Sequence, residues 1–158
     1  MRYLKPFFVV LLSAGTVAVH AQKKPAVKAN VISKKNLPKL TTVLGTYKDS
    51  VAVSIDAAQY LVEQTLLVSD DKNNPYEISS YQVVYRKLGV TEDEQTGKVT
   101  PTTSVSTQLL RTTPLPPVWQ NTLREQMKKG EQLWFIEVIV KDKAGHVWYA
   151  PNVKISFL

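Results

Sequence analysis

Alternating apolar and polar residues mark several stretches of this sequence as β-strands. Successive side chains of a strand point to opposite faces, so alternation predicts a strand with one buried face. Residues 103–111, TSVSTQLLR, are rich in β-branched side chains and predict a further strand. The clearest alternating sets are Val51, Val53 and Ile55; Tyr81, Val83 and Tyr85; and Val153, Ile155 and Phe157.

Residues 132–142, QLWFIEVIVKD, are apolar on both faces, as expected of a strand in the middle of a sheet. Next comes a turn, where Gly145 is free to take a positive φ, and then a returning strand. Pro151 cannot donate to a sheet ladder and interrupts that strand before the closing strand at 152–158. One face of the central strand is expected to carry Trp134, Ile136, Val138 and Val140, and the other Leu133, Phe135 and Ile139.

One segment has the pattern of a helix. Trp119, Leu123 and Met127 recur at helical spacing, two prolines at 116–117 suit a helix start, and Gly130 can cap the end. We therefore predict a short helix at 116–129, packed over one end of the domain. Residues 57–68 are ambiguous between helix and strand. Residues 91–102, TEDEQTGKVTPT, are expected to be a polar loop or hairpin tip.

The expected total is six to eight short strands with one short helix. This pattern indicates an all-β domain, specifically an immunoglobulin-like β-sandwich, at residues 43–158.

The first residues have the pattern of an export signal. Two basic residues precede a short apolar run, and small residues stand before residue 22, which predicts a signal peptide at 1–21. An uncleaved anchor is the alternative, although the run is short for a membrane span. We expect an exported protein with no transmembrane segment after cleavage, located in the periplasm or, alternatively, secreted or held at the cell surface. Residues 22–42 are expected to be a lysine-rich flexible lead-in whose deletion leaves the melting temperature nearly unchanged.

The net charge of +7 comes from the residues before position 43 and not from the expected domain. Six lysines lie in residues 22–42, which contain no acidic residue, whereas residues 43–158 contain 12 basic and 13 acidic residues. No aromatic residue in the basic segment offers a surface on which bases stack. Nucleic acid is therefore not an expected partner.

Few residue types that carry chemistry are present. The chain has no cysteine, which excludes thiol catalysis and cysteine zinc sites, and His146 is the only histidine after residue 20. No nucleophile elbow or glycine-rich phosphate loop occurs. The adjacent acids Glu92, Asp93 and Glu94 match no cation-loop spacing. We predict a protein that is not an enzyme, without cofactor or metal, in which His146 lies at a hairpin tip.

Two groups of positions carry a family resemblance that covers roughly residues 50–158. In its last hairpin and in the strand near residue 80, the chain resembles the C-terminal periplasmic domain of GldM, a core protein of gliding motility and type IX secretion. The resemblance implies a sandwich fold and an exported role in protein interaction. The matching positions are Gly130, Leu133, Phe135, Ile136, Gly145, Pro151, Ile155 and Phe157, with Ile78, Ser80, Tyr81 and Val83 in the earlier strand.

We therefore expect a non-enzymatic interaction module of the bacterial cell envelope that binds another envelope protein. The expected contact surface is the segment with Trp148, Tyr149 and Pro151. The alternative is a secreted carbohydrate-binding module that stacks the same aromatic side chains on sugar rings. The sequence leaves the identity of the partner and the oligomeric state open.

Overall fold

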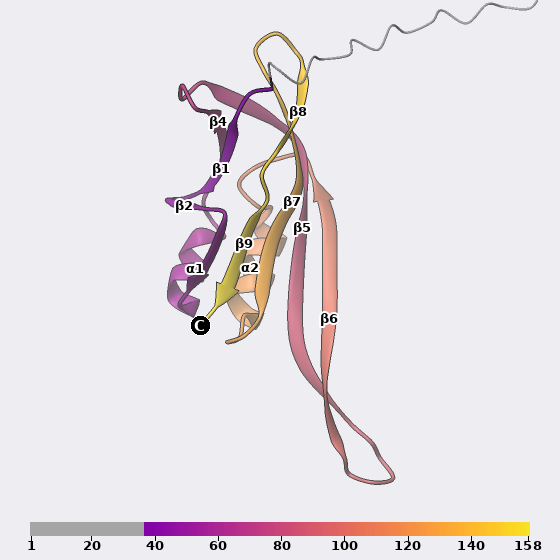
Figure 1. Ribbon diagram of the computed structural model, residues 1–158. Helices are drawn as coiled ribbons and strands as arrows, with labels where there is room; N and C mark the ends of the chain where they lie inside the picture. Colours follow the sequence, from indigo (N-terminus) through magenta and orange to yellow (C-terminus); the bar gives the residue numbers. More distant parts are fainter. Residues whose placement is uncertain (1–36) are drawn as a thin grey trace, which may run out of the picture. The chain divides into compact units, whose positions relative to one another are not determined.

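The computed structural model describes residues 37–158 (Figure 1). The expected signal peptide and most of the lysine-rich lead-in lie outside the described residues. The described part contains no helix that is both long enough and apolar enough to cross a membrane.

The described residues form a mostly β structure, which confirms the all-β prediction. The elements in chain order are β1 (Leu40–Leu44), β2 (Tyr47–Lys48), β3 (Ser50–Val53), α1 (Ile55–Leu61), β4 (Leu66–Asp70), β5 (Pro75–Glu92), β6 (Val99–Leu110), α2 (Pro117–Gln126), β7 (Gln132–Lys141), β8 (Val147–Ala150) and β9 (Val153–Phe157).

Residues 37–158 contain two helices, where one was expected. The ambiguous stretch is helical up to Leu61 and becomes strand β4 from Leu66. Ser54 caps α1 by accepting a hydrogen bond from the Ala57 N–H, and Asp56 in the first turn suits the helix dipole. Because α1 is only two turns long, its apolar period is too short to be recognised in the sequence.

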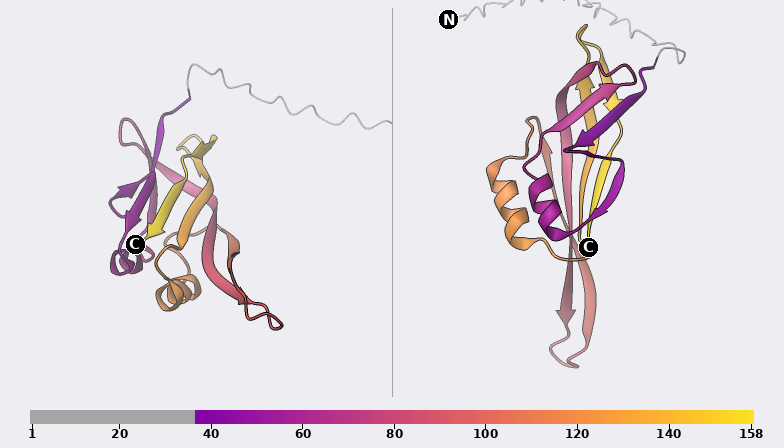
Figure 2. Two further views of the ribbon diagram at one scale, coloured as in Figure 1. Left: turned by 60° about the horizontal axis from the view of Figure 1, so that its bottom comes forward. Right: turned by 90° about the vertical axis from the view of Figure 1, so that its left-hand side faces the viewer.

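All nine strands belong to one hydrogen-bonded sheet, in the order β2-β1-β4-β5-β7-β9-β3. β6 pairs with β5 alone, and β8 pairs with β7 alone. The strand pairs are antiparallel except for β3 and β9, which run parallel. The sheet curls so that β1 comes close to β8 and β9, and the core fills the space inside (Figure 2).

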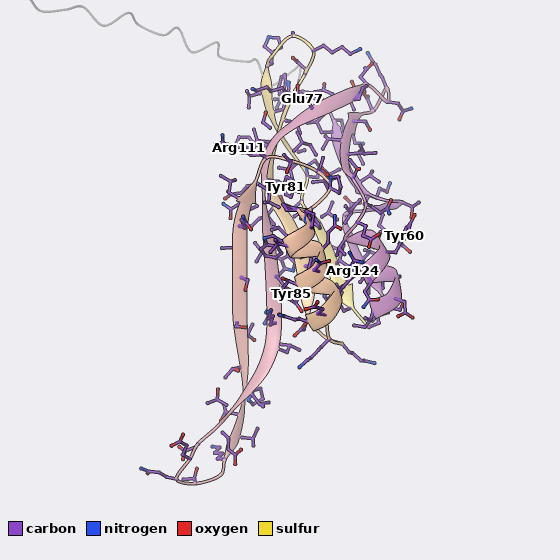
Figure 3. All side chains as sticks on the ribbon, turned by 180° about the vertical axis from the view of Figure 1, so that it is seen from behind. Tyr60, Glu77, Tyr81, Tyr85, Arg111 and Arg124 are labelled. Carbon is purple, nitrogen blue, oxygen red and sulfur yellow. The ribbon has the colours of Figure 1, made fainter. Side chains whose placement is uncertain are left out.

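Strand β5 connects the two parts of this sheet. Tyr81, Val83 and Tyr85 are completely buried, as their alternation predicts. Tyr81 and Tyr85 point from β5 toward α2 (Figure 3), and the Tyr81 hydroxyl donates to the Thr112 carbonyl over 2.9 Å. The α2 residues Leu123 and Met127 are buried against the same core, which confirms the predicted helix.

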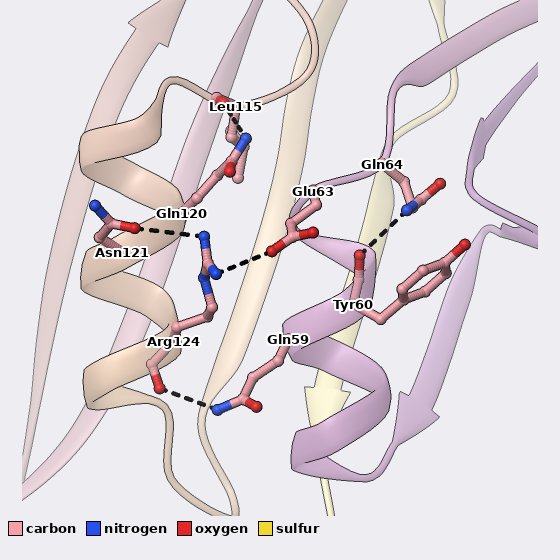
Figure 4. Close-up of polar contacts among 8 residues, drawn as sticks. All are labelled: Gln59, Tyr60, Glu63, Gln64, Leu115, Gln120, Asn121 and Arg124. Carbon is pink, nitrogen blue, oxygen red and sulfur yellow. Dashed lines mark hydrogen bonds and ion pairs between the residues drawn. The ribbon is translucent and has the colours of Figure 1, made fainter.

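The two helices also contact each other through polar groups (Figure 4). Arg124 of α2 forms an ion pair with Glu63 over 3.1 Å, and its carbonyl accepts a hydrogen bond from the Gln59 side chain. These groups are exposed, and such pairs contribute little to stability. The helices are therefore held mainly by the apolar side chains beneath them.

A bulge in β7 overturns one sequence-based assignment. Glu137 has a φ of 51°, and the pairing of β7 with β5 shifts register beside it. Because one extra residue reverses which side of a strand faces inward, Leu133 and Phe135 share the core face with Val138 and Val140. Trp134 therefore lies on the opposite face from Val138, contrary to the expectation from unbroken alternation.

The start of the domain also differs from the expected boundary. β1 begins at Leu40, three residues inside the segment expected to be a flexible lead-in. Leu40 and Thr42 are buried, and β1 pairs along its whole length with β4. Thr41 and Thr42 are both polar, so the alternation of apolar and polar residues that would predict a strand is missing here.

A buried carboxylate ties four elements together. Glu131 is 2% exposed and accepts hydrogen bonds from the Tyr85 hydroxyl and from the N–H groups of Leu88 and Lys128. Its own backbone carbonyl accepts the N–H of Phe157. Glu131 thus joins β5, the end of α2, the start of β7 and β9.

Beyond this point β5 and β6 continue as a two-stranded hairpin. The two strands pair without a register shift from Tyr81 opposite Leu110 to Glu92 opposite Val99. The hairpin extends past both helices (Figure 1) and is exposed on both faces near its tip. Residues 91–102 were expected to be a polar loop or hairpin tip, and they form the tip: 93–98 make the turn, and the residues on either side belong to β5 and β6.

The first prediction concerns the N-terminal boundary. We expect a chain that starts at Leu37 to melt at nearly the temperature of a chain that starts at Gln22. A chain that starts at Val43 loses the buried Leu40 and much of the β1 ladder, so its melting temperature should fall by about 10 °C or more. Thermal unfolding followed by circular dichroism measures both. Equal melting temperatures would show that the first half of β1 does not contribute.

The second prediction concerns Glu131. Glu131→Ala leaves three donors without an acceptor, and we expect it to lower the free energy of unfolding by about 3 kcal/mol or more. Tyr85→Phe removes only one donor and should cost about 1 kcal/mol. Urea denaturation provides the comparison. If Glu131→Ala costs no more than Tyr85→Phe, the carboxylate does not organise this junction.

Candidate protein-interaction surface

The turn between β7 and β8 is organised by Asp142. One carboxylate oxygen accepts hydrogen bonds from the backbone N–H groups of Ala144 and His146, over 2.8 and 2.9 Å. The other lies 2.8 Å from Nδ1 of His146 and accepts the indole N–H of Trp148 over 3.2 Å. The side chain of His146 thus belongs to the closure of a turn.

The same contacts determine the charge of Asp142. Partial burial acts to raise the pKa of its carboxyl, but hydrogen bonds from His146, Trp148 and Ala144 outweigh this and lower the pKa to about 2. The carboxylate therefore stays ionised at neutral pH. A group in this state stabilises the turn and does not exchange protons as a general acid.

The three residues expected to form the contact surface do not lie together. Trp148 packs partly against the core and is held by Asp142, whereas Tyr149 is 76% exposed and points to the other side of β8. Pro151 is exposed after the end of β8. Tyr149 and Pro151 remain available to a partner, but Trp148 offers little free surface.

Sequence reasoning missed a second surface, on the side of the sheet that faces away from the core. Cross-strand neighbours share a face, so the side chains on this side follow from the pairing register. Both helices contribute to the core and so lie on the opposite face (Figure 2). We call this side the outer face; its large apolar side chains are Val84, Leu88 and Val90 of β5, Val99, Val105 and Leu109 of β6, and Trp134 and Ile136 of β7.

This outer face exposes several large apolar side chains among polar ones. A sheet with one face in water normally carries polar side chains there. Here Val90 is 70% exposed and Val105 is 60% exposed, and Trp134 is only partly covered, with the Lys154 ammonium 5.1 Å from its ring centre. Contiguous exposed apolar side chains are typical of protein-interaction sites.

The free edge of β6 adjoins the outer face. No other strand among residues 37–158 pairs with this edge. Its twelve residues contain no charged side chain, and all but Leu110 are exposed. Proteins usually protect such edges with charges, prolines, bulges or short strands. Pro101 is the one such device within β6, and the ladder with β5 has no bulge. The absence of charged residues between Lys98 and Arg111 is visible in the sequence. The position of this segment at the edge of the sheet is not.

A hollow lies where β4 and β6 meet the same edge of β5. It encloses about 450 Å³, and its lining is mostly apolar. The Leu66 N–H in its wall donates to Thr113 over 2.7 Å, so the backbone there is satisfied. The lining includes Val43, Leu67, Val68, Tyr76, Ile78 and Thr113. Glu77 is its only ionisable side chain besides Tyr76, so the hollow provides no acid–base pair.

The acidic residues at the hairpin tip form a turn. The Asp93 carboxylate accepts the N–H groups of Gln95 and Thr96 over 3.0 and 2.9 Å, and these hydrogen bonds lower the pKa of Asp93. Within residues 37–158, no group of three or more histidine or acidic side chains is arranged to hold a metal ion.

The third prediction tests whether the 141–151 turn is structural. Gly145 has a φ of 84°, a conformation that a β-branched residue adopts only with strain, and open space surrounds its Cα. We expect Gly145→Val to destabilise the protein by about 1–2 kcal/mol through the backbone alone. Gly145→Asn should cost much less, since asparagine tolerates this conformation.

His146→Ala should also cost little, because the backbone N–H of residue 146 still donates to Asp142. Thermal unfolding of the three variants gives the order of stability. If Gly145→Asn proves as costly as Gly145→Val, backbone conformation is not the cause.

No protein-family model matches the chain, and no curated protein matches it at a significant level. Among residues 37–158, the features that bear on function are the outer face and the edge of β6.

Proposed function

We propose that this chain is an exported, non-enzymatic protein-interaction module of the bacterial cell envelope. The observation that carries the proposal is the apolar outer face formed by β5, β6 and β7. Burying such a face against a partner removes apolar area from water, which is the main driving force of protein association. Polar groups lie within this face as well, since Gln82 and Arg86 alternate with Val84 along β5. They can hydrogen-bond a partner across the interface.

Two finer parts of the proposal depend on the sequence. The apolar run at the start of the chain supports export, and the GldM-like positions support a role in a secretion or gliding assembly. Several of these positions are buried here, including Leu133, Phe135 and Ile155. Buried apolar positions of this kind are shared by many sheets, so they support a common architecture more strongly than a common partner.

An immunoglobulin-like sandwich is the fold we propose in finer detail. Its support is that β1 lies close to β8 and β9, so two layers enclose the core. The pairing of β4 with β5 joins those layers into one continuous sheet, unlike the two separate sheets of an immunoglobulin domain. The sandwich interpretation therefore applies to the packing of the layers and not to their hydrogen bonding.

The carbohydrate-binding alternative finds less support. Trp148 is turned toward the core, and Lys154 lies over the ring of Trp134. The Trp148 indole is therefore partly buried, and the Lys154 ammonium occupies one side of the Trp134 ring. Tyr149 is the exposed aromatic residue that remains on the expected surface.

The fourth prediction tests the outer face by affinity capture. The mature chain is used as bait in envelope extracts of the source cells, and captured proteins are identified by mass spectrometry. Val90→Lys places a charge on the outer face and should reduce capture of the specific partner by at least ~10-fold. Val118→Lys is the matched control, because Val118 is equally exposed but lies on α2.

A parallel glycan array with wild type and Tyr149→Ala tests the alternative. Sugar binding that is lost in Tyr149→Ala, with no protein captured in a Val90-dependent way, would overturn the proposal. Equal capture by both lysine variants would show that the partner does not use the outer face.

A further inference from the structure

We infer that β6 pairs with β6 of a second copy of this chain, which makes the protein a homodimer with one sheet continuous across both copies. This goes beyond the proposed function, because the pairing uses the unpaired backbone groups of β6, whereas the outer face binds a partner through its side chains. The inference stands on four features of β6: its free edge, its regular ladder, its lack of charge and the register that a two-fold axis imposes.

The free edge supplies the bonding groups. In an antiparallel ladder, every second residue of an edge strand directs its N–H and C=O away from its neighbour. β6 is twelve residues long and regular throughout, so it presents an extended row of such groups. The other outer edges of the sheet are much shorter, since β2, β3 and β8 have between two and four residues.

The lack of charge favours a second copy as the occupant. At a two-fold axis, a charged side chain near the centre of a strand comes close to its own copy, which repels it. No residue from Val99 to Leu110 is charged, so β6 can face itself without this penalty. Its small hydroxyl side chains form favourable cross-strand pairs with one another.

Symmetry restricts the register. A two-fold axis perpendicular to the sheet keeps the outer faces of both copies on the same side, so opposite residues must share a face. With Val105 on the axis, Val105 faces Val105 of the second copy, and Thr103 faces Thr107 of the second copy. Residues 100–110 then lie opposite one another, with Pro101, which has no N–H to donate, opposite Leu109 toward each end, and the two outer faces merge into one.

The ends of β6 agree with this register. Arg111 of the second copy comes to lie opposite Val99, and Glu92 lies opposite Val99 on its other side, in the β5 ladder. Both charged side chains are then on the outer face, with about 10 Å between their backbones. A long arginine side chain reaches across this distance, so opposite charges meet at both ends of the paired strands.

The fifth prediction is a dimer that depends on the centre of β6. We expect the mature chain to sediment as a dimer at micromolar concentration in analytical ultracentrifugation. Val105→Lys puts two ammonium groups face to face at the axis and should weaken the dimer by at least ~10-fold. Val90→Lys carries the same charge on the same face, one strand in from the edge, and should remain dimeric. Because Val105 and Val90 are both well exposed, the variants should fold, which circular dichroism verifies.

Cysteine cross-linking tests the register. The chain has no cysteine, and residues opposite each other in an antiparallel pair lie within disulfide distance. Under mild oxidation, Val105→Cys should form a covalent dimer far faster than Val90→Cys. The single changes Glu92→Arg and Arg111→Glu should each weaken the dimer a few-fold, and combining them should restore it.

The outcomes separate this inference from the proposed function. A chain that stays monomeric at ~100 µM, or a dimer that Val105→Lys does not weaken, overturns the pairing of β6 with itself. The chain could instead stay monomeric, with its β6 amides protected from hydrogen exchange only when a captured envelope protein is bound. That result would show that a strand of the partner occupies the edge. In either case Val90-dependent capture would still support the proposed function, and a dimer without such capture would support this inference alone.

Discussion

The hydrogen-bonded ladder of β5 is the constraint on which the rest of this structure depends. This single strand pairs with β4 at its start, with β7 along its first half and more, and with β6 up to its end. Because β4 carries β1 and β2, and β7 carries β8, β9 and β3, every other strand is attached to the sheet through β5. Tyr81, Val83 and Tyr85 fix its orientation, since a slip of one residue would move all three out of the core.

Glu131 marks the point where β5 stops being part of a core and becomes part of an exposed hairpin. On one side of it, Tyr85 is buried and donates its hydroxyl to the carboxylate. On the other side, Leu88 is bound through its N–H while its side chain is 45% exposed. The packing beside it is close, since a side chain in place of Gly130 would come within 2.9 Å of Leu88. A buried group that satisfies three donors holds the base of the hairpin, and the ladder between β5 and β6 alone supports the rest.

The surfaces follow from this division. The strands around the core bury their apolar side chains, whereas the hairpin has no second layer beyond the reach of α2 and must expose what it carries. The side chains that β6 exposes are uncharged, and one edge of this strand has no hydrogen-bonded neighbour. The ion pairs of the described residues lie away from β6, between Arg124 and Glu63 and in the turn around Asp142. The part of the described chain best suited to association is therefore the part least needed for the core.

The sequence by itself determined the features that depend on near neighbours along the chain. Alternation located β5, β7 and β9, the spacing of Leu123 and Met127 located α2, and Gly145 located a turn, since each depends on local conformation and one buried face. The tertiary structure decided what depends on residues far apart in sequence. The bulge at Glu137 changes which side chains of β7 face the core. The polar residues around Thr42 form a strand because they pair with β4. The outer face and the free edge of β6 likewise exist only because of which strands pair, and strand pairing is a long-range choice that the local pattern does not encode.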